Sequence, residues 1–90
     1  MFNRIEKIMI TQININNPET ELRIELPVTL REGDLIDLEF IIDKSIESYY
    51  KTNKEDFLNY MEDYGSTFIV VSSCLIMQGG KYEWEVLIKK

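Results

Sequence analysis

The chain has no histidine and a single cysteine, Cys74, among its 90 residues. Histidine is the commonest general base and the commonest metal ligand, and a lone cysteine cannot form an internal disulfide. These two absences exclude histidine-based catalysis and zinc sites. Because carboxylates are the only strong ligands left, we expect no cofactor and no metal.

Alanine is absent as well, whereas isoleucine occurs thirteen times. Alanine is the best helix former and β-branched isoleucine favours strands, so the composition favours a mainly β protein. No apolar run approaches the roughly 18 residues of a membrane span, and the N-terminal residues lack a basic region followed by an apolar block. We therefore expect a single domain over residues 1–90, located in the cytoplasm and with no membrane partner.

Positive charge is scarce, because 10 Lys and Arg residues face 16 Asp and Glu residues, for a net charge of -6. A chain with this balance repels phosphate, and no glycine-rich phosphate loop is present. A basic groove lined with aromatic rings, which single strands need, is not indicated. The charge balance therefore disfavours nucleic acid as a partner.

The first expected strand, over residues 4–15, changes the face of its apolar side chains near Thr11. Two pairs result, Ile8 with Ile10 on one face and Ile13 with Ile15 on the other. One extra residue in the strand would return all four side chains to one face. The pattern therefore predicts a β-bulge near Thr11 and a bent strand.

Clean alternation of apolar and polar residues predicts two further strands, over residues 21–28 and 35–42. Residues 68–77 are apolar on both parities, which predicts a strand covered on both faces. Residues 78–81 predict a tight hairpin into a fifth strand over residues 82–89. The apolar positions predict one core, made of Leu22, Ile24, Leu26, Ile36, Leu38, Phe40, Val70, Trp84 and Val86.

Between the third and fourth strands, a helical segment is expected over residues 45–64, although residues 44–51 also fit an irregular lead-in. Thr52 and Glu55 have capping-box spacing, ahead of an amphipathic helix of about three turns. The segment is rich in tyrosine, a residue enriched in interface cores. Its candidate interaction residues are Tyr49, Tyr50, Phe57, Tyr60, Met61 and Tyr64.

The expected order of elements is β-β-β-α-β-β, with a bent first strand and the helix between the third and fourth strands. This is the order of the five-stranded OB barrel. An SH3-like barrel with the helix as an insertion fits the same order. We therefore predict a mainly β fold with one helix, in the form of a five-stranded small barrel that is OB-like or SH3-like.

Part of the sequence resembles a pattern found in short, uncharacterised bacterial and phage proteins. The shared positions are Leu26-Pro27-x-x-Leu30-Arg31-x-Gly33-Asp34-x-Ile36-x-Leu38, Phe68-x-Val70-x-Ser72 and Tyr82-x-Trp84-x-Val86. They cover the second to fifth strands and consist of turn residues and alternating apolar positions. The resemblance implies a small β-barrel without catalytic residues. The helical stretch over residues 43–65 departs from that pattern.

Candidate catalytic groups do not converge in the sequence. Its i,i+2 carboxylate pairs, Asp37 with Glu39 and Glu83 with Glu85, have a spacing that is common on the solvent-facing side of a strand. Serine and cysteine nucleophiles need an activating base, and Cys74 has the parity of a core position. We therefore expect no enzyme, and no catalytic, cofactor-binding or metal-binding residues.

These features favour a non-enzymatic protein-interaction or structural accessory module, related to phages or mobile elements. Its expected partner is another protein or a second copy of the chain, bound through the strand over residues 68–77 or through the helical segment. Two alternatives stay open: a nucleic-acid-associated OB-like protein, and an acidic decoy that mimics DNA.

Overall fold

The fold is built on one mixed sheet of six strands, in the order β3-β5-β6-β1-β2-β4. A computed structural model describes residues 9–90. Its strands and helix are β1 (Met9–Asn16), β2 (Glu19–Leu26), β3 (Leu35–Asp37), β4 (Glu47–Tyr50), α1 (Lys54–Tyr64), β5 (Thr67–Gln78) and β6 (Lys81–Lys89). Two 3-10 turns, η1 (Leu38–Phe40) and η2 (Ile42–Lys44), lie between β3 and β4. The prediction of a mainly β fold with one helix is therefore confirmed.

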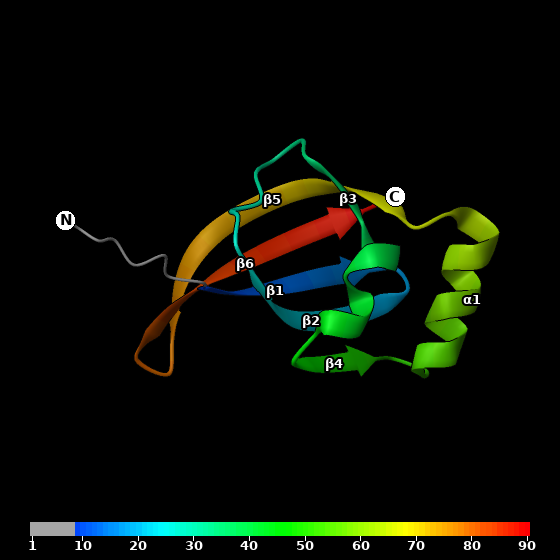
Figure 1. The fold of residues 1–90 in the computed structure, drawn as a ribbon, viewed down its shortest axis with the longest axis horizontal. Coiled ribbons are helices and arrows are strands. Elements are labelled where there is room, and N and C mark those ends of the chain that lie inside the picture. The colour runs from blue at the N-terminus through cyan, green and yellow to red at the C-terminus, as the bar shows by residue number, and fades with distance from the viewer. Residues whose placement is uncertain (1–8) are drawn as a thin grey trace.

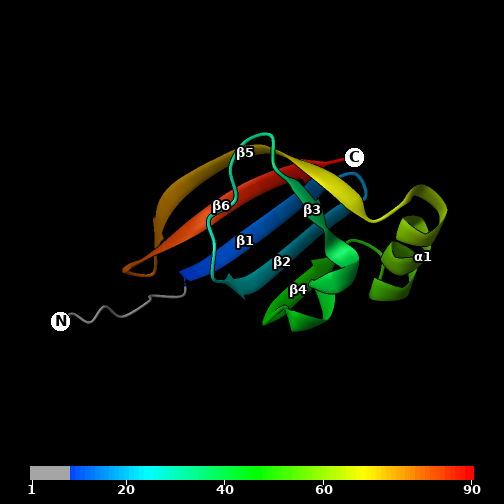
Figure 2. The same ribbon diagram turned by 45° about the horizontal axis from the view of Figure 1, so that its top comes forward.

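The sheet curls into a half-barrel around a central pair of strands (Figures 1 and 2). β1 pairs with β2 in antiparallel and with β6 in parallel orientation, and β5 and β6 form an antiparallel hairpin. β3 and β4 are the edge strands, attached to β5 and β2. The 3-10 turns span the open side, because η1 lies against β5 and η2 lies against β2.

The hydrophobic core fills the concave side of the half-barrel. Its buried apolar side chains are Ile13, Ile15, Leu22, Ile24, Ile36, Leu38, Ile42, Phe57, Met61, Phe68, Val70, Val86 and Ile88. Most of the predicted core is found there, and Leu26 and Trp84 pack against it while partly exposed. Phe40 was wrongly predicted to be buried, because its side chain is 73% exposed.

The predicted third strand over residues 35–42 is too long, because β3 ends at Asp37. The Asp37 carboxylate accepts hydrogen bonds from the Glu39 backbone N–H at 3.0 Å and from the Ser66 hydroxyl at 2.6 Å. It thereby caps η1 and turns the chain away from the sheet. After this turn Leu38 still points inward, whereas Phe40 points to solvent.

The predicted bulge at Thr11 is also wrong, because β1 pairs with β2 without a register shift from Met9 to Asn16. Thr11 is itself buried on the core face, next to Ile13 and Ile15. The strand is therefore regular, and a polar residue occupies a core-facing position at which the prediction expected an apolar one. Ile8 lies outside the described residues. The bulge of this sheet is in β5, where the register with β6 shifts between Val70 and Ser72.

The predicted helical segment over residues 45–64 is too long at its start, because Glu47–Tyr50 forms β4 beside β2. This extra strand makes the sheet six-stranded and corrects the prediction of five. The helix cap is Asn53, whose side chain accepts a hydrogen bond from the Asp56 N–H at 2.8 Å. It lies one residue after the predicted Thr52. No helix within residues 9–90 is long and apolar enough to cross a bilayer.

Candidate interaction site at the open edge of strand β5

β5 is much longer than the strand that covers its outer edge. β3 pairs only with Thr67, Phe68 and Ile69. The pairing then ends at Val70, whose carbonyl accepts from the Gly33 N–H at 2.8 Å and whose N–H donates to the Asp34 carbonyl at 2.8 Å. Within residues 9–90, no segment outside the hairpin makes a backbone hydrogen bond to residues 71–78. We call residues 71–78 the open edge.

The hairpin turn determines which backbone groups of the open edge face outward. Gln78 and Lys81 flank a two-residue turn, in which Gly79 and Gly80 adopt φ values of 62° and 81°. Residues that flank such a turn exchange backbone hydrogen bonds, and the residues of an antiparallel strand alternate in direction. The residues that direct their N–H and C=O groups away from β6 are therefore Ser73, Leu75 and Met77.

The same stretch exposes apolar side chains. Leu75 is 49% exposed, Met77 58% and Tyr82 57%. The register places Met77 opposite Tyr82, and Leu75 opposite the half-buried Trp84. We call these four residues the hairpin patch. It continues the apolar concave face beyond the core, toward the end of the sheet that lies away from α1 (Figure 1).

The open edge lacks the features that usually protect an edge strand. Residues 71–78 contain no charged residue, no proline and no glycine. Native edges are commonly blocked by charge, proline or shortness. The opposite edge strand, β4, spans only Glu47–Tyr50 and carries a charged residue, Glu47. The contrast between the two edges marks β5 as the edge able to accept another strand.

A hollow of about 480 Å³ adjoins the open edge. It lies between the segment that crosses the concave face from β2 to β3 (Figure 2) and the middle of β5. Its lining residues are Thr29, Leu30, Arg31, Glu32, Ser72, Ser73 and Trp84. The Ser73 hydroxyl is buried and has no hydrogen-bond partner within residues 9–90. The hollow therefore offers both space and one free polar group beside the edge.

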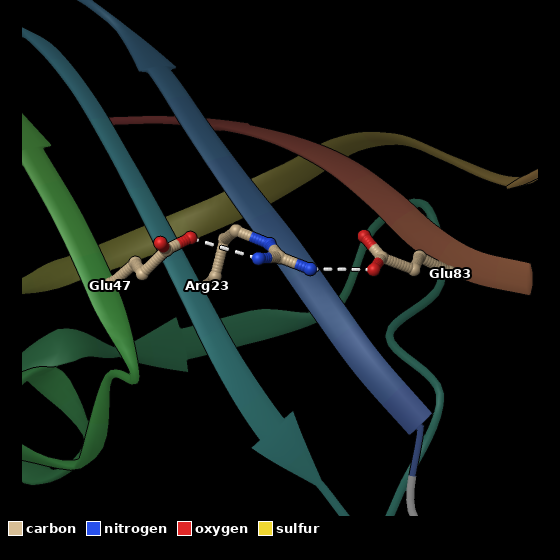
Figure 3. A network of polar contacts seen from close by, with 3 residues as sticks. All are labelled: Arg23, Glu47 and Glu83. Atoms are coloured by element: carbon tan, nitrogen blue, oxygen red, sulfur yellow. Dashed lines mark hydrogen bonds and ion pairs between the residues drawn. The ribbon is translucent and has the colours of Figure 1, made fainter. Parts of the chain in front are cut away.

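The opposite, outer face of the sheet carries a network of charged residues (Figure 3). Arg23 donates from Nη1 to Glu47 Oε1 at 2.8 Å and from Nη2 to Glu83 Oε2 at 2.5 Å. The hydrogen bond to Glu47, followed by the charge of Glu83, raises the pKa of Arg23 above its ordinary value. The Glu83 side chain is only 8% exposed. This network ties β4, β2 and β6 together across β1.

The predicted carboxylate pairs do not form a chemical site. Glu83 was expected on a solvent-facing strand side, but it is buried beside Arg23, while Glu85 is half-buried. Asp37 caps η1, as described above, and Glu39 is exposed. Among residues 9–90, no three Cys, Asp or Glu side chains lie close enough together to hold a metal ion.

The candidate interaction residues of the helical segment separate into three groups. Phe57 and Met61 are buried in the core, and Tyr50 and Tyr60 are half-buried against it. The aromatic rings of Tyr50, Tyr60 and Phe68 pack around Phe57, with centroid distances of 5.8 Å, 6.2 Å and 6.5 Å, respectively. Tyr49 and Tyr64 are exposed, at separate places in β4 and at the end of α1.

The open edge lies within the strand over residues 68–77, which was predicted as an interface alongside the helical segment, although no single residue of it was named as an interaction residue. Its signal in the sequence is the apolar run over residues 68–77, which exceeds what one buried face needs. Cys74, expected in the core, is exposed on the outer face because of the bulge at Val71.

Comparisons of the chain with family models, with curated proteins and with solved structures give no match. The site is therefore interpreted from its own geometry.

Proposed function

We propose that this protein is a non-enzymatic interaction module of the cytoplasm, which binds another protein chain by strand addition at the open edge of β5. The observation that carries the proposal is this uncharged edge, whose outward backbone groups have no partner within residues 9–90 and beside which Leu75 and Met77 are exposed. In strand addition, backbone hydrogen bonds give affinity and alternate side chains give specificity. The hollow beside Ser73 is positioned to receive such a side chain.

Two further observations support an accessory role. Two of the described nucleophiles have structural surroundings, since Ser66 donates to the Asp37 carboxylate that caps η1, and Cys74 is exposed without a basic neighbour in β5. The resemblance to short bacterial and phage proteins, in which turn and core positions are shared, favours an accessory protein of that kind. An OB-like or SH3-like barrel type belongs to the same proposal, since both are common scaffolds for binding.

Affinity capture from the native cell tests this function with three baits. These are the wild type, Leu75→Lys at the edge, and Leu58→Lys on α1, where the leucine is also partly exposed, at 40%. A lysine in an edge strand blocks strand addition. We expect a partner that binds the wild type and Leu58→Lys but is lost with Leu75→Lys. A partner held equally by all three baits contradicts the proposal, and so does a bait that captures neither another protein nor a second copy of the chain.

A second candidate function, the acidic decoy, rests on the outer face of the sheet. Gln12 lies between Arg23 and Glu85 in the register, which places these residues on one face. The charged side chains of that face are Glu19, Glu21, Glu25, Glu47, Glu83 and Glu85 against Arg23, Lys81 and Lys89. Such a face attracts basic surfaces. Capture of DNA-binding proteins that salt elutes, unchanged by Leu75→Lys, would favour this function.

Nucleic-acid association gains no such support. Arg23 is already engaged by two carboxylates, and Lys54 is paired with Asp43 at 3.0 Å. The remaining described cations are spread over separate loops and strand ends. Phosphate binding requires several free cations on one surface.

A further inference from the structure

We propose that a second copy of this chain occupies the open edge of β5, so that two half-barrels join into one continuous sheet about a two-fold axis at Leu75. This inference rests on the proposed function, because it names the protein chain that is bound. A two-fold contact uses the same surface patch on both subunits, so the patch must be self-complementary. The open edge meets this requirement in its backbone groups, in its apolar side chains and in its lack of charge.

The backbone groups determine how two such edges pair. A two-fold axis perpendicular to the sheet relates adjacent strands in antiparallel orientation and keeps the concave faces on one side. Outward-facing residues must then meet outward-facing residues. Ser73, Leu75 and Met77 satisfy this condition when Leu75 meets Leu75 of the second copy and Ser73 meets Met77 of the second copy.

The boundaries of the open edge select this register. At one end Gly33 and Asp34 already bind Val70, and Val71 is the bulged residue, which a regular ladder leaves unpaired. At the other end the strand stops at Gln78. The stretch available for regular pairing is thus residues 72–78, and Leu75 lies at its centre. A register centred on Cys74 would force the second copy against the segment at Gly33.

The lack of charge on the open edge favours a second copy over an acidic or basic chain, because a charged strand would find no opposite charge there. The paired stretch is uncharged, so two chains of net charge -6 meet where neither brings a carboxylate. Antiparallel pairing places the hairpin end of one copy beside the segment around Gly33 of the other. That segment carries Arg31 as well as Glu32 and Asp34, so it presents charges of both signs.

The side chains gain burial in the same arrangement. Leu75 and Met77 lie on the concave side, where each copy exposes about half of both side chains. Cross-strand apolar pairs are the unit of sheet stabilisation. Leu75 against Leu75, flanked by Ser73 against Met77 on either side, forms an apolar strip across the joint.

Analytical ultracentrifugation of the pure full chain tests the dimer. We expect a dimer for the wild type at high micromolar concentration and for Leu58→Lys. We expect the dissociation constant of Leu75→Lys to rise by at least about tenfold, because two like charges then lie directly opposite each other. Thermal melting shows whether each variant is folded. A wild-type monomer at that concentration, or a dimer that Leu75→Lys leaves intact, overturns the proposal.

Disulfide trapping tests the register and does not depend on the lysine variant. Directly opposite residues have Cβ atoms about 4.5–5.5 Å apart and diagonal ones about 7–8 Å, and a disulfide needs the shorter separation. Mild oxidation should therefore crosslink Leu75→Cys in a Cys74→Ser background much faster than it crosslinks the wild type through Cys74. Leu58→Cys in the same background is the control, and it should not crosslink. Faster crosslinking through Cys74 overturns the register centred on Leu75.

The results separate this inference from the proposed function. A monomeric protein that still captures a partner through Leu75 would contradict the second copy as the bound chain and would support the interaction module. A dimer that captures no other protein keeps the second copy and shows that the module binds itself.

Discussion

Single residues determine where a strand of this chain ends, even where the alternation of apolar and polar residues continues. Leu38 and Phe40 have the same parity and the same apolar character, and a regular strand would bury both. The Asp37 carboxylate instead caps a 3-10 turn, and the two side chains then diverge. A short polar side chain that bonds to the backbone two residues later competes with sheet pairing.

The divergence gives a first prediction. Leu38→Ala removes a fully buried side chain and should lower the free energy of unfolding by about 2–5 kcal/mol, whereas Phe40→Ala removes an exposed one and should stay within about 0.5 kcal/mol. Denaturant melts of the two variants measure both values. Equal losses would mean that Phe40 is buried in solution.

The Arg23 network gives a second prediction at the residue scale. Arg23→Met leaves the Glu83 carboxylate, whose side chain is 8% exposed, without its partner, and we expect it to lower the free energy of unfolding by more than Glu47→Ala does. Glu47→Ala removes a carboxylate that is 67% exposed and should cost less than about 1 kcal/mol.

Urea melts at neutral pH distinguish the two ends of this network, with Arg23→Met and Glu83→Gln combined as the control. The double variant should recover part of the loss, because it leaves no unpaired carboxylate at the buried position 83. A loss from Glu47→Ala as large as that from Arg23→Met would contradict the ranking.

At the scale of elements, the periodicity of the sequence predicted which helices and strands exist better than it predicted the residues at which they begin and end. The alternating residues 21–28 correspond to β2, and the apolar residues 68–77 correspond to β5. β4 could not be predicted, because Glu47–Tyr50 has no alternation of its own and owes its conformation to pairing with β2. The bulge in β5 lies between Val70 and Ser72, just past the residues that pair with β3, and the alternation of the sequence does not indicate it.

The start of α1 gives a third prediction. Asn53 accepts from the Asp56 N–H as the cap, so Asn53→Ala should lower stability by about 0.5–2 kcal/mol. Thr52→Ala should have little effect, although the capping-box spacing pointed to Thr52. Thermal melts followed by far-UV circular dichroism compare the two, and a larger loss for Thr52→Ala would place the cap one residue earlier.

The helix also shows why the predicted interaction residues are poor probes of an interface. Met61 packs in the core with Phe57. A charged residue at position 61 would therefore destabilise the packing of α1 against the core, whether or not α1 also contacts a partner. An amphipathic stripe with tyrosine and methionine has the same sequence signature whether it faces a core or a partner. The structure distinguishes the two by placing Phe57 against Phe68 of β5.

At the scale of the whole molecule, the candidate site arises from a mismatch in strand length. No local pattern shows that β3 is short and that β5 extends past it, because the two strands are far apart in the sequence. The apolar excess of residues 68–77 was visible, and it predicted that both faces would be covered. That the backbone edge beside this run has no partner within residues 9–90 could be recognised only from the order of the strands in the sheet.

Net charge gives the last prediction, which concerns the salt dependence of self-pairing. Two copies of charge -6 with centres roughly 30 Å apart repel by about 5 kcal/mol in unscreened water. The Debye length falls from about 30 Å at 0.01 M salt to about 8 Å at 0.15 M, so salt removes most of this repulsion. Sedimentation at increasing salt should therefore show tighter dimerisation. Self-association that weakens steadily with salt would instead indicate that opposite charges, and not the uncharged open edge, hold the two copies together.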